Sequence, residues 1–341
     1  MALSGEFSLA CDIPGFRRGI IGVSSQQAKI IPKNPVGGKI MRIGINSGAA
    51  SGPETTIDGL IARAQQIEAA GFDSMWLANM FGLDAMTMLA LIGRETKTLQ
   101  LGTAVVPSYP RHPLVMAQQA ATTQAAAQGR FTLGIGLSHQ PIIEGMLGMS
   151  YDKPARHMRE YLQVLAPALA NERVQFSGDQ YRVNGQITVK ESSGVPLVVA
   201  ALGDIMLKHA GTYADGTITW MTGAQTLESH IIPKIRKAAA DAGKPAPRIV
   251  AGMPVAIVPD KDAARDRIDK GMKMYGQLAS YRAMLDNEGV DGPSGIAIIG
   301  DEKELRSAIG RLRDIGVTDL NCAVLGVGDP EVTFDFLASE L

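Results

Sequence analysis

His139 is the residue whose type and position point most directly to chemistry. It is one of five histidines in the chain, and it follows the glycine-flanked run 134–138, where the plane of a flat ligand could approach a strand end. Because an imidazole titrates near neutral pH, His139 could donate a proton to a bound molecule or hydrogen-bond to its ring. The alternative interpretation is structural, with His139 capping the helix that follows.

A second stretch, Ala201-Leu202-Gly203-Asp204, has the pattern of an anion site. It precedes a predicted helix, and the free N–H groups and the dipole at a helix start favour a phosphate. A single glycine is a weak signal, and the carboxylate of Asp204 opposes an anion unless it only caps the helix. We interpret the stretch as a candidate phosphate seat.

Other common kinds of site are missing from the sequence. It contains no Ser-His-Asp order, zinc-ligand spacing or P-loop, and Cys11 and Cys322 stand far apart. We therefore expect no metal site, and a reducing cytoplasm is the simplest compartment. The formal net charge of -1 argues against a nucleic-acid partner. No segment approaches the ~20 apolar residues that a membrane span requires, so we expect no membrane partner.

From Met41 onward the hydrophobic pattern alternates between strand and helix, and these elements must position the candidate residues. Strands are predicted at 42–45, 73–77, 99–106, 131–135, 197–200, 217–220, 249–258 and 319–324. Helices are predicted at 56–70, 84–94, 113–128, 155–169, 205–212, 227–242, 262–286 and 302–315. A hairpin at 174–183 interrupts the alternation after the fourth strand, and a short apolar run lies at 296–299.

Repeated strand–helix steps require parallel strands with right-handed crossovers. An open, doubly wound sheet would carry a glycine-rich phosphate loop after its first strand, but residues 46–52 lack the G-x-G-x-x-G spacing. Eight units over roughly 300 residues instead predict a single α/β domain at 41–341, a (β/α)8 TIM barrel with a hairpin-containing insertion after strand 4. Residues 1–40 show no helical or strand period, so we expect an irregular N-terminal extension, or an upstream start with Met41 as the working start.

From about Met41 to its C-terminus the chain resembles the luciferase-like flavin/deazaflavin superfamily. It looks closest to the branch that uses coenzyme F-420, an 8-hydroxy-5-deazaflavin. The matching stretches are 101–107 (LGTAVVP), 129–136 (GRFTLGIG), 151–160 (YDKPARHMRE) and 214–216 (ADG). Together and in this order they are specific to the superfamily, whereas any one alone would not be.

The resemblance implies a homodimer and a non-proline cis peptide at Ala104-Val105, in a bulge that supports the central ring of the deazaflavin. In such a barrel the active site lies at the C-terminal ends of the strands. The expected cofactor contacts are Asn79, Thr103, Ala104, Val105, Gly136, Ser138, His139, Ala201, Leu202, Gly203 and Asp204. His139 is also the expected catalytic residue, and the expected substrate pocket comprises Met80, Tyr109, Trp220 and Met221.

The chain departs from the sugar-phosphate dehydrogenase branch at two strand ends. That branch has Asp-His where this chain has Asn79-Met80, and a catalytic Glu where it has His139. The departures favour reductive chemistry by an F-420-dependent oxidoreductase, with hydride passing to an electron-poor C=C or C=N bond of a small apolar substrate. The alternatives are an FMN-dependent monooxygenase of the same fold, which would consume O2, and a non-catalytic flavin or deazaflavin carrier.

Overall fold

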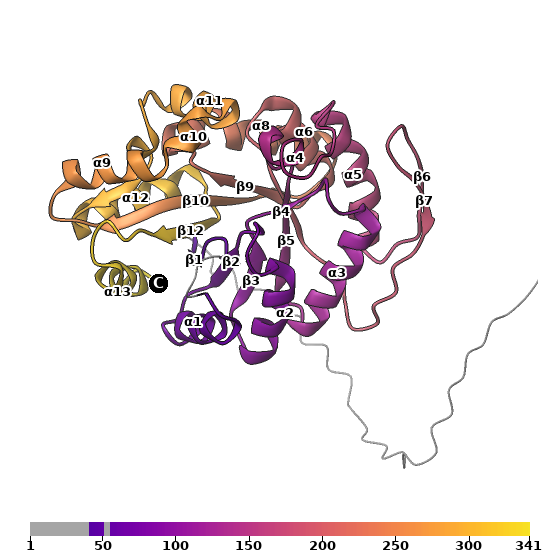
Figure 1. Ribbon diagram of the computed structural model, residues 1–341, viewed down its shortest axis with the longest axis horizontal. Helices are drawn as coiled ribbons and strands as arrows, with labels where there is room; N and C mark the ends of the chain where they lie inside the picture. The colour runs from indigo at the N-terminus through magenta and orange to yellow at the C-terminus, as the bar shows by residue number, and fades with distance from the viewer. Residues whose placement is uncertain (1–40, 51–54) are drawn as a thin grey trace, which may run out of the picture. The chain divides into compact units, whose positions relative to one another are not determined.

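The computed structural model describes residues 41–50 and 55–341, so the extension predicted at 1–40 lies outside the described residues. Eight parallel strands close into a barrel, which confirms the predicted fold class (Figure 1). In spatial order these are β10 (Arg248–Ile257), β12 (Asp319–Val324), β1 (Arg42–Asn46), β2 (Ser74–Leu77), β3 (Gln100–Thr103), β5 (Phe131–Gly136), β8 (Leu197–Ala200) and β9 (Gly216–Trp220). β9 pairs back to β10 and completes the ring.

Helices follow the strands and cover the outside of the barrel (Figure 1). They are α1 (Ile57–Ala69), α2 (Ala85–Glu95), α3 (Pro113–Ala126), α4 (Gln140–Ile143), α5 (Pro154–Leu169), α6 (Asp204–Tyr213), α7 (Ala224–Thr226), a π-helical turn (Leu227–Ile231), α8 (Ile232–Asp241), α9 (Lys261–Gly271), α10 (Lys273–Gln277), α11 (Ala279–Glu288), a 3-10 turn (Pro293–Gly295), α12 (Glu302–Ile315) and α13 (Pro330–Ser339).

Three further pairings lie outside the ring. β4 (Val106–Pro107) continues β3 along β5, and β11 (Ile298–Gly300) pairs with the second half of β10. The insertion after the fourth barrel strand contains the antiparallel hairpin of β6 (Val174–Ser177) and β7 (Arg182–Gly185), as the sequence predicts. The short apolar run expected at 296–299 is therefore an accessory strand and not a member of the barrel.

The single helix predicted at 262–286 is wrong. The structure divides this stretch into α9, α10 and α11, with breaks at Met272 and at Leu278, whose backbone is extended at φ -77° and ψ 122°. Gly271 and Gly276 lie beside the breaks, and glycine is the least favourable residue after proline in a helix interior. α13 was not predicted, although Asp329 at its N-cap followed by Pro330 is a recognisable helix start.

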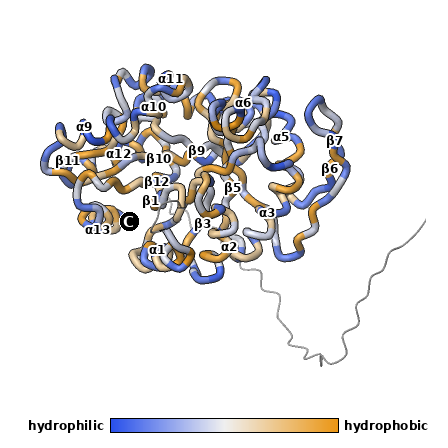
Figure 2. Tube along the Cα trace, in the orientation of Figure 1, coloured by the Kyte–Doolittle hydropathy of each residue, from blue (hydrophilic) through white to orange (hydrophobic). Residues whose placement is uncertain are grey.

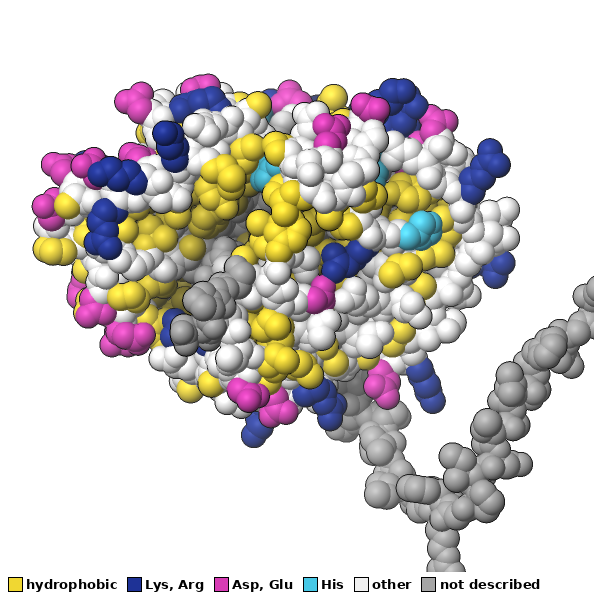
Figure 3. Space-filling view, in the orientation of Figure 1, with side chains coloured by type: hydrophobic (Ala, Val, Ile, Leu, Met, Phe, Trp, Pro, Cys, Tyr) yellow, Lys and Arg dark blue, Asp and Glu magenta, His cyan; other side chains and the backbone are white. Residues whose placement is uncertain are grey.

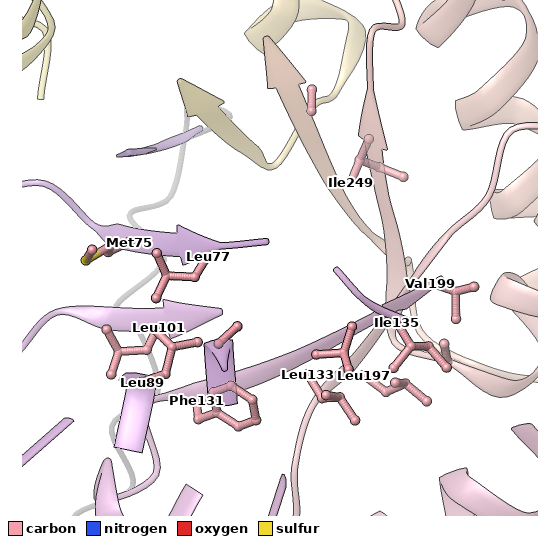
Figure 4. Packing of buried hydrophobic residues seen from close by; sticks show 14 of the residues in the cluster. Met75, Leu77, Leu89, Leu101, Phe131, Leu133, Ile135, Leu197, Val199 and Ile249 are labelled. Carbon is pink, nitrogen blue, oxygen red and sulfur yellow. The ribbon is translucent and has the colours of Figure 1, made fainter. Parts of the chain in front are cut away.

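The strands alternate between an outer and an inner layer of side chains. Outward-facing residues pack against the helices, and Leu101, Phe131 and Leu89 share this layer (Figure 4). Figure 2 shows hydrophobic colour along the strands and hydrophilic colour at outer segments such as α9. The inner layer is a separate small cluster that fills the lumen: Trp76, Val198, Ile218 and Val250, with Ala104, Val105 and Ala200 packed on it. The barrel is thus a filled core rather than a pore.

Three charged residues close the N-terminal end of the barrel. Asp319 opens β12 and is 1% exposed; its carboxylate accepts hydrogen bonds from Arg42 Nε and Arg248 Nη2, both at 2.7 Å. Arg248 also donates to Thr132 Oγ1 of β5 at 3.1 Å, and its guanidinium lies 5.4 Å from the centroid of the Trp76 ring. Burial alone would raise the pKa of Asp319, but the hydrogen bonds and charges of Arg248 and Arg42 lower it to about 2.

We predict that Asp319→Asn lowers the free energy of unfolding by about 3–5 kcal/mol at pH 7, because two arginines lose a buried counter-charge. The folded-state pKa of Asp319, about 2, lies below the ordinary 3.8. Its stabilisation is therefore present above pH 3.8 and is lost as the pH falls towards 2. Urea denaturation at pH 7 and pH 3 measures both effects, with the exposed Asp241→Asn as control. Equal denaturation midpoints for D319N and the unsubstituted protein at pH 7 would show that the ion pairs of Asp319 do not stabilise the barrel.

Candidate functional site

The candidate residues lie in segments that follow different barrel strands. Asn79 follows β2, His139 follows β5, Gly203 follows β8 and Met221 follows β9. Because the strands are parallel, these segments share the C-terminal end of the barrel. On the face drawn in Figure 3, hydrophobic side chains border a hollow. An apolar depression with a few polar groups is typical of small-molecule sites.

A bulge interrupts the third barrel strand at Ala104 and Val105, and the peptide bond between them is cis, as the resemblance implies. Both sides of the bulge are tied to the end of β2. The N–H of Ala104 donates to the carbonyl of Leu77 at 2.7 Å, and the N–H of Asn79 donates to the carbonyl of Val105 at 3.2 Å. Ala104 and Val105 are half-buried on the cluster in the lumen. They therefore form an apolar platform on top of the filled barrel.

Glycine in β5 makes room for this platform. A Cβ on Gly136 would lie 2.8 Å from Cγ2 of Val105, and a Cβ on Gly134 would lie 2.0 Å from the carbonyl oxygen of Thr103. Larger residues at either position would push the bulge out of place. The glycine-flanked strand end noticed in the sequence therefore accommodates the bulge of the neighbouring strand.

The side chains of Thr103 and Asn79 already have partners in the fold. The Thr103 hydroxyl donates to the Gly134 carbonyl and accepts from the Gly134 N–H, both at 2.8 Å, in a fully buried position. Asn79 Oδ1 accepts from the N–H of Ala85 at the start of α2, at 3.0 Å. A ligand at the platform would meet the backbone of Thr103 rather than its hydroxyl. Met80, the next residue, is 50% exposed.

His139 occupies the N-cap position of α4, but its side chain makes no capping hydrogen bond. No hydrogen bond therefore supports the alternative interpretation of this histidine as a helix cap. Burial lowers the pKa of His139 below the ordinary 6.5, so the imidazole is neutral at pH 7. The preceding residue, Ser138, has a left-handed backbone (φ +61°), which a non-glycine residue adopts only where its surroundings hold it.

A line of aromatic rings runs from the end of β9 to His139. Tyr275 of α10 lies edge-on to Trp220 at 6.2 Å between ring centroids, and Tyr281 of α11 lies edge-on to Tyr275 at 5.2 Å. The His139 ring follows at 5.8 Å from Tyr281. Burial raises the pKa of both tyrosines, so they stay protonated. Neither tyrosine is recognisable from the sequence, because both lie in the long helical stretch predicted at 262–286.

The stretch 201–204 forms the start of α6, as predicted. Gly203 is the N-cap, no side chain caps the helix, and a Cβ on Gly203 would meet nothing within 4 Å. The exposed Asp204 is ion-paired with Lys234 of α8, and His230 Nε2 lies 2.8 Å from the carbonyl oxygen of Leu202. Ala201 is buried beneath. Open backbone at an uncapped helix start is what an anion site needs, and the ion pair of Lys234 with Asp204 leaves no net charge beside it.

The insertion braces Tyr109, which follows β4. The Tyr109 ring stacks on His157 at 3.9 Å and on Tyr151 at 5.2 Å between centroids. His157 is itself fixed, because Ser108 Oγ lies 2.9 Å from Nε2 and Gln180 Oε1 lies 3.0 Å from Nδ1. The Tyr109 hydroxyl is buried and has no hydrogen-bond partner among the described residues. This bracing could not be read from sequence, since it joins residues far apart in the chain.

Among the described residues there is neither a metal-binding cluster nor a membrane-spanning helix. Across 41–50 and 55–341, no group of three or more His, Cys, Asp or Glu side chains is arranged to hold a metal ion. Within the same part of the chain, no helix combines the length and the apolar character needed to cross a bilayer.

Comparison with known proteins gives a family and several relatives. Residues 41–335 match the family described as luciferase-like monooxygenase. A 5,10-methylenetetrahydromethanopterin reductase from Methanolobus tindarius is 26% identical over 285 residues, covering 75% of this chain and 87% of that protein. An F-420-dependent glucose-6-phosphate dehydrogenase from Mycolicibacterium fortuitum is 29% identical over 219 residues, covering 60% of this chain and 65% of that protein.

Two solved structures illustrate the shared fold. The coenzyme F-420-dependent tetrahydromethanopterin reductase from Methanopyrus kandleri superposes with a TM-score of 0.69 at 22% identity, covering 88% of this chain and 98% of that one. The oxygenating constituent of 3,6-diketocamphane monooxygenase from Pseudomonas putida, in complex with FMN, superposes with a TM-score of 0.71 at 16% identity, covering 88% and 97%.

Proposed function

The chain belongs to the luciferase-like monooxygenase family, and from this premise we propose that it is a coenzyme F-420-dependent oxidoreductase. In this proposal hydride passes between the deazaflavin and a small, apolar, unsaturated substrate. The relatives of this chain within the family are reductases, dehydrogenases and monooxygenases. The chain is therefore an oxidoreductase of the luciferase-like class, and this argues against a non-catalytic carrier.

The observation that carries the proposal is the apolar platform of Ala104 and Val105. It stands over a lumen filled by aromatic and aliphatic side chains, beside Gly136 and Ala200, which present little or no side chain. A flat, largely apolar ring system fits such a surface by stacking, without needing a charged partner. The uncapped start of α6 at Gly203, open to solvent, fits a phosphate on the same ligand. The residues present therefore suit a flavin-type cofactor.

The named relatives favour the deazaflavin over the flavin. The dehydrogenase at 29% identity is F-420-dependent by name, whereas the F-420-dependent reductase structure, at 22% identity, supports the fold alone. FMN remains the second candidate because an FMN complex shares the fold, although identity of 16% supports the fold alone. Both cofactors have a tricyclic ring and a phosphate, so the platform and the phosphate seat are common to the two proposals.

The bound deazaflavin would supply two-electron hydride chemistry. The protein itself orients the cofactor and the substrate, and it supplies or positions a proton. Ala104, Val105 and Gly136 hold the ring, while the backbone at Leu202 and Gly203 takes the phosphate. His139 supplies or orients the proton that accompanies hydride. Met80, Tyr109 and Trp220 line the apolar substrate pocket, whereas Met221, which was also expected there, is fully buried and lies beneath the surface. The aromatic line through Tyr275 and Tyr281 keeps water from that side.

An anaerobic turnover assay tests the reaction class. We expect the purified protein to oxidise reduced F-420 in the presence of enones, imines or nitroaromatics, with no oxygen uptake when air is admitted. A deazaflavin reacts poorly with O2, so oxygen consumption separates the two candidates. Substrate oxidation that requires reduced FMN and consumes O2 would overturn the F-420 proposal in favour of the monooxygenase.

His139→Ala should slow reductive turnover by ~10²-fold or more while leaving F-420 affinity roughly unchanged. The pKa of His139 is lowered below 6.5 by burial, and only the protonated imidazole donates. Turnover of the unsubstituted enzyme should therefore rise as the pH falls through that pKa, and H139A should lose this limb of the pH profile. His209→Gln, on the outer helix α6, is the matched control. A retained limb in H139A would remove His139 from the proton path.

A further inference from the structure

Exposed hydrophobic side chains are concentrated at one end of the barrel. Of the twelve large hydrophobic residues that are exposed in the described parts of the chain, Leu91 lies in the second half of α2, away from the strand end, and Leu341 lies beyond α13. The other ten stand in loops or helices at the C-terminal end of the barrel, the end that carries the candidate site. A monomeric soluble protein rarely gathers exposed apolar surface without a binding function.

Five of the ten belong to two loops, and we call them the apolar rim: Met80, Phe81, Met146, Leu147 and Met149. Phe81 is 59% exposed and Met146 is 61% exposed, so neither contributes its full surface to the core. Three of the five are methionines, whose flexible, polarisable side chains adapt to varied apolar shapes. The two loops follow β2 and α4, close in sequence to Asn79 and His139, at the end of the barrel that carries the proposed active site.

The inner wall of the site is neutral as well as aromatic. Burial keeps His139 deprotonated near pH 7 and keeps Tyr275 and Tyr281 protonated. Two basic residues at this end are already engaged: Arg111 pairs with Asp84 at 2.6 Å, and Lys234 pairs with Asp204 at the start of α6. None of these groups presents an unpaired charge to a substrate, so they favour a neutral one.

We infer that the substrate is a neutral lipophilic molecule with an extended apolar body that lies on the apolar rim. Its electron-poor double bond reaches the platform at Ala104 and Val105. This inference rests on the proposed function and names its substrate class. The reaction is the same two-electron reduction: one hydride from the reduced deazaflavin and one proton add across the double bond, and the cofactor is oxidised by two electrons. A second copy of the chain is the alternative occupant of the rim, and the oligomeric state of a rim variant tests it.

Binding of a homologous series of straight-chain 2-alkanones, from 2-hexanone to 2-dodecanone, tests the inference on the full chain without cofactor. Each ketone displaces the neutral dye Nile red, and the displacement gives its Kd. If the chain lies on the rim, each added methylene should lower Kd about fourfold. The double variant Phe81→Ser, Met146→Ser should reduce that step to less than twofold. Leu91→Ser, 40% exposed on α2 and remote from the site, should keep it.

Three results would overturn the inference: a Kd that does not change with chain length, an equal loss in L91S, or conversion of a dimer to monomers in the double variant with unchanged Kd values. The last result, measured by light scattering, would assign the rim to self-association. F-420 binding, measured separately by its fluorescence, keeps the two proposals apart. Ketone binding without F-420 binding would sink the proposed function, and F-420 binding without the chain-length dependence would sink only the substrate class.

Discussion

The ion pair between Asp319 and Arg248 closes one end of the barrel, and the arrangement at the other end depends on that closure. Burying a carboxylate is costly, and the cost is met here by two arginines on neighbouring strands. Arg248 extends the closure across the lumen to β5 and over Trp76. Trp76 in turn needs Gly102 on β3, where a Cβ would come within 2.2 Å of its ring. With the lumen filled in this way, a ligand can only be received on top of it.

That constraint explains why the site is shallow and apolar at its base. The platform of Ala104 and Val105 rests directly on the lumen cluster and is accommodated by Gly136. Polar groups are placed only at the edges: His139 on one side, and the open start of α6 on another. The aromatic line from Trp220 to Tyr281 closes the wall between β9 and His139. Such a division, with a flat apolar floor and a few polar edges, suits a planar cofactor that carries its own redox chemistry.

The sequence was sufficient for the barrel because each strand–helix step has a local signature, in hydrophobic spacing and in residues such as Pro113 at a helix start. It was insufficient where tertiary contacts decide. The breaks around α10 were hidden by helical periodicity on both sides, and so Tyr275 and Tyr281 were missed. Thr103 was expected at the cofactor, but its hydroxyl is taken up by the backbone of Gly134. The bracing of Tyr109 by His157 joins residues too far apart for any local pattern to indicate.

The proposed function depends on the binding of a deazaflavin at the platform and at the start of α6. Fluorescence titration of the purified protein with F-420 and, separately, with FMN measures this binding. We expect saturable binding of F-420 with a Kd at least tenfold lower than that for FMN. Binding of FMN alone, or tighter binding of FMN than of F-420, would show that the site is not built for a deazaflavin.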